Sequence, residues 1–216
     1  MQDSSGIKKP ILLFDFDGTL ADTLLSIVGI VNRIGMEYKL RKIDNEELLK
    51  IRKMEAGELI KYSGLPLLEV PFFVSRVRKI LKKEIRTIRP FPAIPEILHR
   101  LFQVKYDMYI ITSNSKESVE KFLTENNLEF FRSVNSERNL WGKGKALKDF
   151  LKKSGIRSSE AVYFGDEIRD IKAAREAGLR IASVGWGFND IEGLRKHSPD
   201  WLIKSPEEIL EVLKNL

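Results

Sequence analysis

The sequence predicts an α/β protein with a mostly parallel sheet and helices on both of its faces. Short apolar segments of strand length alternate with longer segments in which apolar residues recur at helical spacing. Such alternation is typical of parallel strands joined by crossover helices. Residues 22–89 depart from it, because they contain only helical patterns. We therefore expect a Rossmann-like core of residues 1–21 and 90–216, with a small all-helical domain of residues 22–89 inserted after the first strand.

The chain begins with an apolar strand, expected at residues 11–16, and then changes to a helical period. Gly64 is expected to end one of the helices that follow, since glycine adopts the left-handed conformation found after helix ends. Two prolines in the segment Arg89-Pro90-Phe91-Pro92 mark the return to the core. The helices expected in the insertion cover residues 22–34, 45–62 and 67–88.

The second part of the chain returns to alternating strands and helices. Asn114, followed three residues later by Glu117, resembles a helix capping box. Ligands of parallel sheets bind beyond the carboxyl ends of the strands. Strands are expected at residues 108–111, 130–134, 161–164, 181–184 and 201–203, and helices at 94–103, 116–125, 143–153, 167–177 and 206–213.

Two carboxylates lie two residues apart where the first strand should end. Asp15 and Asp17 belong to the segment Phe-Asp-Phe-Asp-Gly-Thr-Leu of residues 14–20. In near-extended backbone, side chains at positions i and i+2 point the same way. Burying such charges without a partner is costly, which indicates a cation, a proton or a chemical role. A carboxylate can attack phosphorus, a second can carry a proton, and both suit Mg²⁺.

This segment resembles the first motif of the haloacid dehalogenase superfamily of phosphohydrolases. The resemblance implies that Asp15 is the nucleophile and Asp17 the general acid and base. The dehalogenase branch lacks the second aspartate, so Asp17 favours phosphate chemistry over carbon–halogen chemistry. The resemblance extends over residues 10–184 and places the helical insertion as a cap over the active site, as in the phosphoglycolate-phosphatase-like branch.

Two further motifs supply candidate phosphate ligands. Thr112 ends an apolar strand, and its hydroxyl together with the backbone N–H groups of Ser113 and Asn114 could hold a phosphate oxygen. Thr112 resembles the second motif of the family, and Lys143 resembles the third-motif lysine. Many members have proline after that lysine, whereas this chain has glycine, so Lys145 remains an alternative to Lys143.

The fourth motif is an acidic segment, Gly-Asp-Glu-Ile-Arg-Asp, that follows the strand at 161–164. Asp166 and Asp170 are four residues apart and therefore share a helical face. The segment resembles the metal-binding motif of the family, which implies that Asp166 and Asp170 join Asp15 and the backbone carbonyl of Asp17 as ligands of Mg²⁺. Glu167 occupies a position where other members often have aspartate.

Composition limits the classes of partner. The net charge of +6 is concentrated in residues 22–89, which hold 15 Lys and Arg against 9 Asp and Glu. These basic residues are dispersed at helical spacing without a nucleic-acid motif, so a solvated surface is the simpler interpretation, and steering of an anionic substrate is a second. No apolar segment approaches the ~20 residues of a membrane span. The chain has no cysteine, which is compatible with a cytoplasmic protein.

The sequence therefore predicts a Mg²⁺-dependent phosphatase that hydrolyses a small phosphate monoester through an aspartyl-phosphate, as a monomer or homodimer. Arg52 and Lys53 in the insertion are candidate contacts for the leaving group. Two alternatives remain: a sugar-phosphate mutase of the same superfamily, and a catalytically silent binding protein on the same fold. Nucleic-acid binding through the basic insertion is a weaker possibility.

Overall fold

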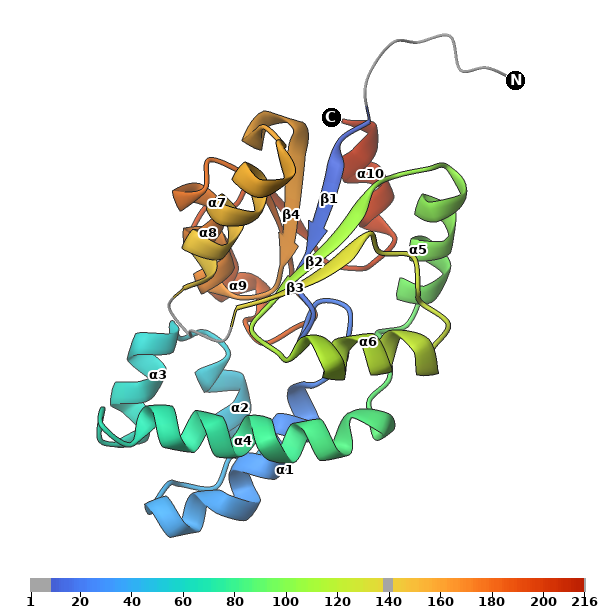
Figure 1. Ribbon diagram of the computed structural model, residues 1–216. Coiled ribbons are helices and arrows are strands. Elements are labelled where there is room, and N and C mark those ends of the chain that lie inside the picture. The colour runs from blue at the N-terminus through green and yellow to red at the C-terminus, as the bar shows by residue number, and fades with distance from the viewer. Residues whose placement is uncertain (1–8, 138–141, 216) are drawn as a thin grey trace, which may run out of the picture.

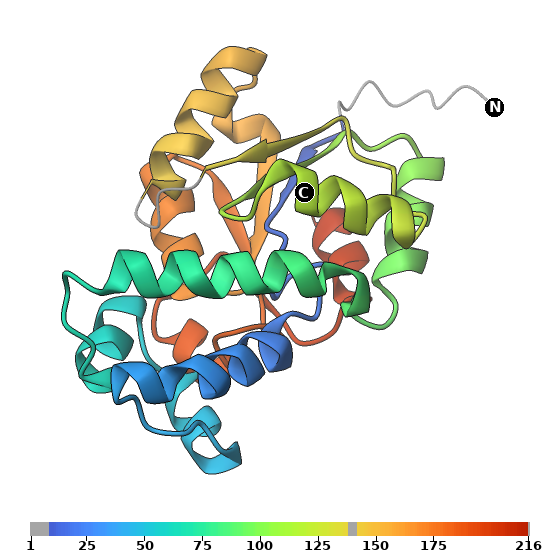
Figure 2. The ribbon, with the colours of Figure 1, turned by 60° about the horizontal axis from the view of Figure 1, so that its bottom comes forward.

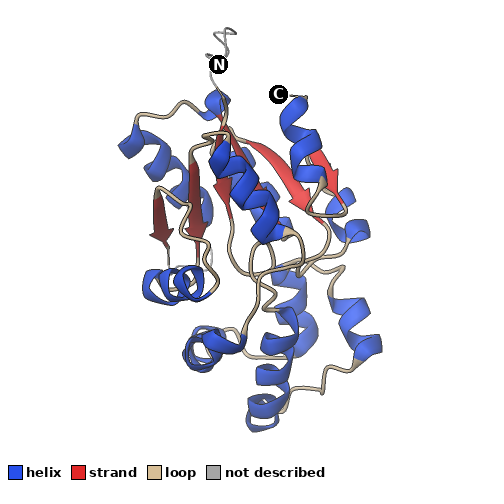
Figure 3. Cartoon of the chain, turned by 90° about the vertical axis from the view of Figure 1, so that its right-hand side faces the viewer, coloured by secondary structure: helices blue, strands red, loops and turns tan. Residues whose placement is uncertain are grey.

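A computed structural model describes residues 9–137 and 142–215. Its central feature is one parallel sheet of six strands in the order β3-β2-β1-β4-β5-β6 (Figures 1 and 3). The strands are β1 (Ile11–Phe14), β2 (Met108–Thr112), β3 (Ser133–Ser136), β4 (Ala161–Gly165), β5 (Arg180–Val184) and β6 (Trp201–Ile203).

Helices cover both faces of the sheet, as predicted. Successive side chains of a strand point to opposite faces, so Leu12 and Phe14 belong to one buried cluster and Leu13 to the other. The first cluster lies under α5 (Ile94–Gln103), α6 (Lys116–Glu125) and α10 (Glu208–Lys214), and the second under α7 (Lys143–Ser154), α8 (Ile168–Glu176) and α9 (Ile191–Arg195). The predicted α/β class with a parallel sheet is therefore confirmed.

Four helices form a separate group beyond the carboxyl ends of the strands (Figures 1 and 2). The chain leaves the core and returns to it at neighbouring points, because Asp22 N donates to Arg89 O at 2.9 Å and Phe91 N to Leu20 O at 3.0 Å. We propose that this group is the cap and that its limits are residues 22 and 89; the first eight residues assigned to the core lie outside the described ranges. The helices are α1 (Leu24–Ile34), α2 (Asn45–Ile51), α3 (Ala56–Ser63) and α4 (Val70–Glu84).

The single helix predicted at 45–62 is wrong, since α2 and α3 are separate helices. The backbone carbonyls of Arg52 and Met54 between them accept hydrogen bonds from Asn189 Nδ2 at 2.8 and 3.0 Å. These carbonyls accept hydrogen bonds from a residue far away in the sequence, so the helical hydrogen-bond pattern does not continue through residues 52–54. Gly64 ends α3 in the left-handed conformation, at φ 73°, as predicted.

Several smaller expectations also differ from the structure. The N-cap of α6 is Ser115, whose side chain accepts from Ser118 N, and not Asn114. Helix α4 begins at Val70, three residues later than expected, and β3 lies at 133–136 instead of 130–134. The short helix α9 was not predicted. Among the described helices, none has both the length and the apolar character needed to cross a membrane.

Candidate active site

The order of the strands determines where the site lies. The chain winds outward from β1 to β2 and β3 on one side, and through β4 to β5 and β6 on the other. Parallel sheets bind ligands where the order reverses in this way. Asp15 follows β1 and Asp166 follows β4, and Asp15 N donates to Phe164 O at 2.8 Å. The first and fourth sequence motifs therefore meet at this point of the sheet.

Asp15 is buried and paired with a cation. One of its oxygens accepts from Lys143 Nζ at 2.5 Å and the other from Phe16 N at 2.7 Å, and only 2% of the residue is exposed. Lys143 Nζ also contacts Asp170 at 2.5 Å, so one buried ammonium bridges two carboxylates. The first and third motifs are thereby joined directly.

Burial and neighbouring charge act on the pKa of this pair in opposite directions. Burial raises the pKa of Asp15 to about 7, although the charge of Lys143 opposes it. Burial alone would lower the pKa of Lys143, but the negative charges of Asp15 and Asp170 raise it above its ordinary value. Lys143 therefore remains an ammonium at neutral pH.

Asp17 has a different partner. The side-chain amide of Asn114 donates to both carboxylate oxygens of Asp17, at 3.3 and 3.1 Å. Burial raises the pKa of Asp17, and the Asn114 hydrogen bond offsets this only in part. From the sequence, Asn114 is expected only to cap a helix and to offer its backbone N–H to a phosphate, and no contact of its side chain with Asp17 is predicted. Its position directly after a strand end was the signal that could have pointed to the side chain.

The acids of the fourth motif divide into two groups. Both oxygens of Asp166 are engaged, one by Thr19 Oγ1 at 2.8 Å and the other by Phe188 N at 2.7 Å. Glu167 pairs with Arg169 at 2.5 Å. Asp15, Glu167 and Asp170 each place one carboxylate oxygen in a cluster whose members all lie within 4.8 Å of one another.

This cluster fits a hard divalent cation. Carboxylate oxygens are the ligands that Mg²⁺ prefers. The site also carries more acidic than basic side chains, and excess buried negative charge calls for a cation. Of the predicted side-chain ligands, the cluster contains Asp15 and Asp170, while Asp166 lies beside it. The ligand predicted from Asp17 is its backbone carbonyl, and the Asp17 side chain is held by Asn114. The acidic residues are Asp15, Asp17, Asp166, Glu167 and Asp170, and the basic ones are Lys143 and Arg169.

The candidate phosphate ligands lie at the end of β2 and the start of α7. Thr112 is buried, and its Oγ1 accepts from Asn114 N at 3.0 Å. Ser113 follows it and is half-buried. Lys145 is exposed, whereas Lys143 reaches Asp15. The geometry therefore favours Lys143 over Lys145 as the lysine of the third motif.

The two candidate substrate contacts in the cap lie against a loop of the core. The guanidinium of Arg52 donates to Gly187 O at 2.8 Å and to Phe188 O at 3.2 Å. Lys53 forms an exposed ion pair with Glu192 at 2.5 Å. Both residues thus connect the cap to the segment that follows β5.

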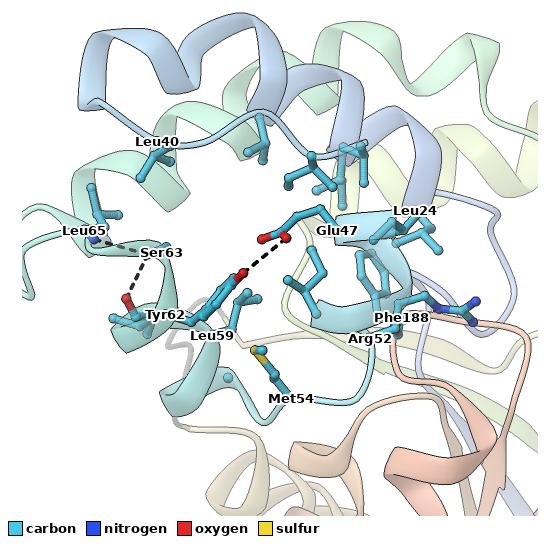
Figure 4. Close-up of a pocket in the computed structure, with 18 of the residues that line it drawn as sticks. Leu24, Leu40, Glu47, Arg52, Met54, Leu59, Tyr62, Ser63, Leu65 and Phe188 are labelled. Atoms are coloured by element: carbon cyan, nitrogen blue, oxygen red, sulfur yellow. Dashed lines mark hydrogen bonds between the residues drawn. The ribbon is translucent and has the colours of Figure 1, made fainter. Parts of the chain in front are cut away.

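The cap helices line a cavity of about 310 Å³ that is open to solvent. Most of its lining comes from α1 to α4, and four core residues, Glu167, Arg169, Phe188 and Asn189, close one side. Figure 4 shows Arg52 and Phe188 next to each other at the wall of this cavity. The cavity therefore adjoins the acidic cluster through Glu167.

Comparison with known proteins agrees with this geometry. Residues 12–184 match the family model of the haloacid dehalogenase-like hydrolases. A phosphoglycolate phosphatase of Synechococcus elongatus is 31% identical over 95% of this chain and 97% of its own. A predicted phosphatase from Clostridium acetobutylicum superposes with a TM-score of 0.82 at 20% identity, over 97% of this chain and 100% of its own. A candidate β-phosphoglucomutase of Thermotoga maritima reaches 0.67 at 22% identity, over 96% and 99%.

The two solved structures show the likeness of the fold alone, since both are below 25% identical. The family match covers most of the chain and contains all four motifs that meet at the carboxyl ends of β1, β2 and β4. The resemblance inferred from those motifs and the predicted class of enzyme, a hydrolase, are thereby confirmed. The chain belongs to the family of haloacid dehalogenase-like hydrolases.

Proposed function

We propose that this protein is a Mg²⁺-dependent phosphatase that hydrolyses a small phosphate monoester through an aspartyl-phosphate on Asp15. The observation that carries the proposal is the buried Asp15 carboxylate, which is bridged by Lys143 to Asp170 and lies beside a second acid, Asp17. The Synechococcus elongatus relative, named a phosphoglycolate phosphatase, supports phosphate esters as the class of substrate.

In this mechanism Asp15 attacks phosphorus in line and displaces the alcohol oxygen of the ester. The Lys143 ammonium lies at the nucleophile, so it offsets negative charge on the carboxylate and on the phosphoryl group during transfer. Thr112 and the backbone N–H groups after it are the proposed donors to the phosphoryl oxygens. Water then attacks phosphorus and releases phosphate from Asp15.

Asp17 is the proposed carrier of the proton. Its raised pKa increases the protonated fraction near neutral pH, as a general acid requires. It would protonate the departing alcohol oxygen in the first step and take a proton from the attacking water in the second. Asn114 holds its carboxyl group in place through the side-chain amide.

Asp15, Glu167 and Asp170 are the residues that would hold Mg²⁺, with Asp166 beside them. A bound Mg²⁺ offsets charge on the carboxylates and on the phosphoryl oxygens. The contribution of the chain itself is to gather these acids around one point while keeping them away from bulk water.

A sugar-phosphate mutase is the second candidate, because one structural neighbour is a candidate β-phosphoglucomutase. In a mutase the phosphoryl group of Asp15 returns to a sugar instead of passing to water. A silent binding protein is less compatible with the site, since it has no need of Asp17, Lys143 and Asp170 together.

The test is phosphate release from a panel that includes the acyl phosphate acetyl phosphate and two monoesters, phosphoglycolate and a sugar phosphate. Wild type and Asp15→Asn are compared, with Mg²⁺ and with excess chelator. We expect Mg²⁺-dependent release by the wild type alone. Isomerisation of the sugar phosphate without net release would favour the mutase. The absence of any reaction would contradict both.

A further inference from the structure

We infer that the alcohol part of the substrate is apolar, an alkyl or aromatic group that enters the cavity lined by the cap helices. This inference rests on the proposed function, since it assigns the leaving group of the same phosphate ester. It separates this chain from an enzyme built for phosphoglycolate, whose leaving group is a two-carbon alcohol bearing a carboxylate.

The first argument is the nature of the cavity wall. Helices α2 and α3 contain no fully buried residue, although both carry leucine and isoleucine. Leu48, Ile51 and Ile60 are only half-buried, and all three line the cavity. Apolar side chains that line an open cavity of this size stay in contact with water, so they form a surface that favours an apolar ligand.

The second argument is that the polar side chains of the wall have partners, apart from Arg41, an exposed residue of the loop before α2. Tyr62 donates to Glu47 at 3.1 Å, and Ser63 donates to Ile60 O at 2.8 Å (Figure 4). Arg52 and Asn189, which also line the cavity, are bonded to backbone carbonyls. A carboxylate that entered this space away from Arg41 would lose its water without gaining a donor from these paired groups, which is costly.

The third argument is continuity with the catalytic residues. Glu167 lines the cavity, and one of its oxygens lies within 4.8 Å of oxygens of Asp15 and Asp170. Phe188 also lines it, and the backbone N–H of Phe188 holds Asp166. A phosphoryl group at Asp15 therefore places its ester substituent next to the cavity. At about 310 Å³ the space lies at the lower end of the ~300–1,000 Å³ range of ligand sites.

The experiment uses a series of primary alkyl phosphates, ethyl, butyl and hexyl phosphate. Their leaving alkoxides are of similar basicity, so differences in kcat/KM report the contacts of the chain. We expect kcat/KM to rise by up to about fourfold per methylene until the cavity is filled. Calorimetry with Asp15→Asn is expected to show tighter binding of hexyl phosphate than of phosphoglycolate. A flat or falling series, or tighter binding of phosphoglycolate, would overturn the inference.

Two neighbouring residues offer a matched pair of variants. Leu48 lines the cavity, whereas Leu49 is 63% exposed and does not. Leu48→Trp should fill the cavity and lower the ratio of kcat/KM for hexyl over ethyl phosphate by roughly fifteenfold, the equivalent of about two methylenes. Leu49→Trp should leave that ratio unchanged. Val28→Phe, which fills the cavity from α1, replaces Leu48→Trp if that variant does not fold.

The outcomes separate the inference from the proposed function. If Leu48→Trp and Val28→Phe raise Tm but leave the ratio unchanged, the cavity is a packing void and the inference is wrong. If acetyl phosphate and phosphoglycolate are hydrolysed but kcat/KM does not rise with alkyl chain length, the proposed phosphatase activity is supported and the apolar leaving group is refuted. If no ester releases phosphate, the proposed function fails, and binding of hexyl against ethyl phosphate to the wild type still tests the cavity.

Discussion

Asp15 and Asp17 show how partners can give two neighbouring carboxyl groups different chemistry. Asp15 contacts an ammonium, which favours its charged form against the effect of burial. Asp17 contacts a neutral amide, which lowers the pKa of Asp17 and offsets part of the effect of burial. The Lys143 ammonium can offset negative charge at Asp15 during phosphoryl transfer, so we propose Asp15 as the nucleophile and Asp17 as the carrier of the proton. The sequence identified both residues, but it did not indicate that Asn114 holds Asp17.

Replacing Asn114 with alanine removes the side-chain hydrogen bonds to Asp17 and tests the proposed role of Asp17 as the carrier of the proton. The Asn114 amide lowers the pKa of Asp17, so its loss should raise that pKa further. If Asp17 acts as the general acid, the basic limb of the pH profile of kcat/KM should move to higher pH. A limb that stays in place or moves to lower pH would contradict the role of Asp17.

Metal-free protein should lose stability as pH rises from about 4 to about 7. The pKa of Asp15 is raised from 3.8 to about 7, so over this range the folded chain holds more protons than the unfolded chain. The free energy of unfolding then falls with pH, by on the order of 4 kcal/mol for a shift of this size. Urea unfolding in chelator at several pH values measures it. Asp15→Asn should show a smaller decline, and an identical decline would refute the assignment.

The spacing of apolar residues predicted the strands and most helices, because apolar residues recur at a different period in a strand and in a helix. Helices α5 and α6 begin and end where the pattern placed them. The break between α2 and α3 was missed, because the carbonyls of residues 52 and 54 bond to Asn189, which is more than 130 positions away. No local signal in residues 45–62 records that contact.

Asn189 is the residue at which this contact can be tested. Its side chain is 7% exposed, donates to Arg52 O and Met54 O, and accepts from Ile168 N at 2.9 Å. Asn189→Ala removes this partner from Met54 O and Ile168 N, while Arg52 O keeps its bond from Asp190 N at 3.1 Å. The free energy of unfolding should fall by about 1–3 kcal/mol. Asn215→Ala is the control, because that amide bonds to Glu211 O on the exposed end of α10 and should change stability by less than about 0.5 kcal/mol. Equal effects would show that Asn189 does not join the cap to the core.

The whole molecule brings four sequence motifs to one edge of a sheet and covers that edge with a helical group (Figure 2). The motifs were predictable, because each lies at a strand end or helix start that the pattern marks. The cavity was not predictable, since it depends on how four helices pack against one another and against the loop after β5. The pairing of Glu167 with Arg169 likewise requires the folded site.

Mg²⁺ should stabilise the folded protein, because the acidic cluster exists only when the chain is folded. At a concentration of Mg²⁺ about 100 times its Kd the gain is about 2.7 kcal/mol. The measurement is the Tm across a Mg²⁺ titration. Asp170→Asn should reduce the response strongly, whereas Asp149→Asn, at an exposed position of α7, should not. Equal responses of the two variants would place the cation elsewhere.

The central claim is that Asp15 carries the phosphoryl group. A single turnover of an ester labelled in its phosphate, quenched with acid at successive times, measures covalent label and free phosphate together. We expect label to appear on the wild type before phosphate is released, and we expect Asp15→Asn to form neither. Release of phosphate by Asp15→Asn at a rate close to that of the wild type would contradict the claim.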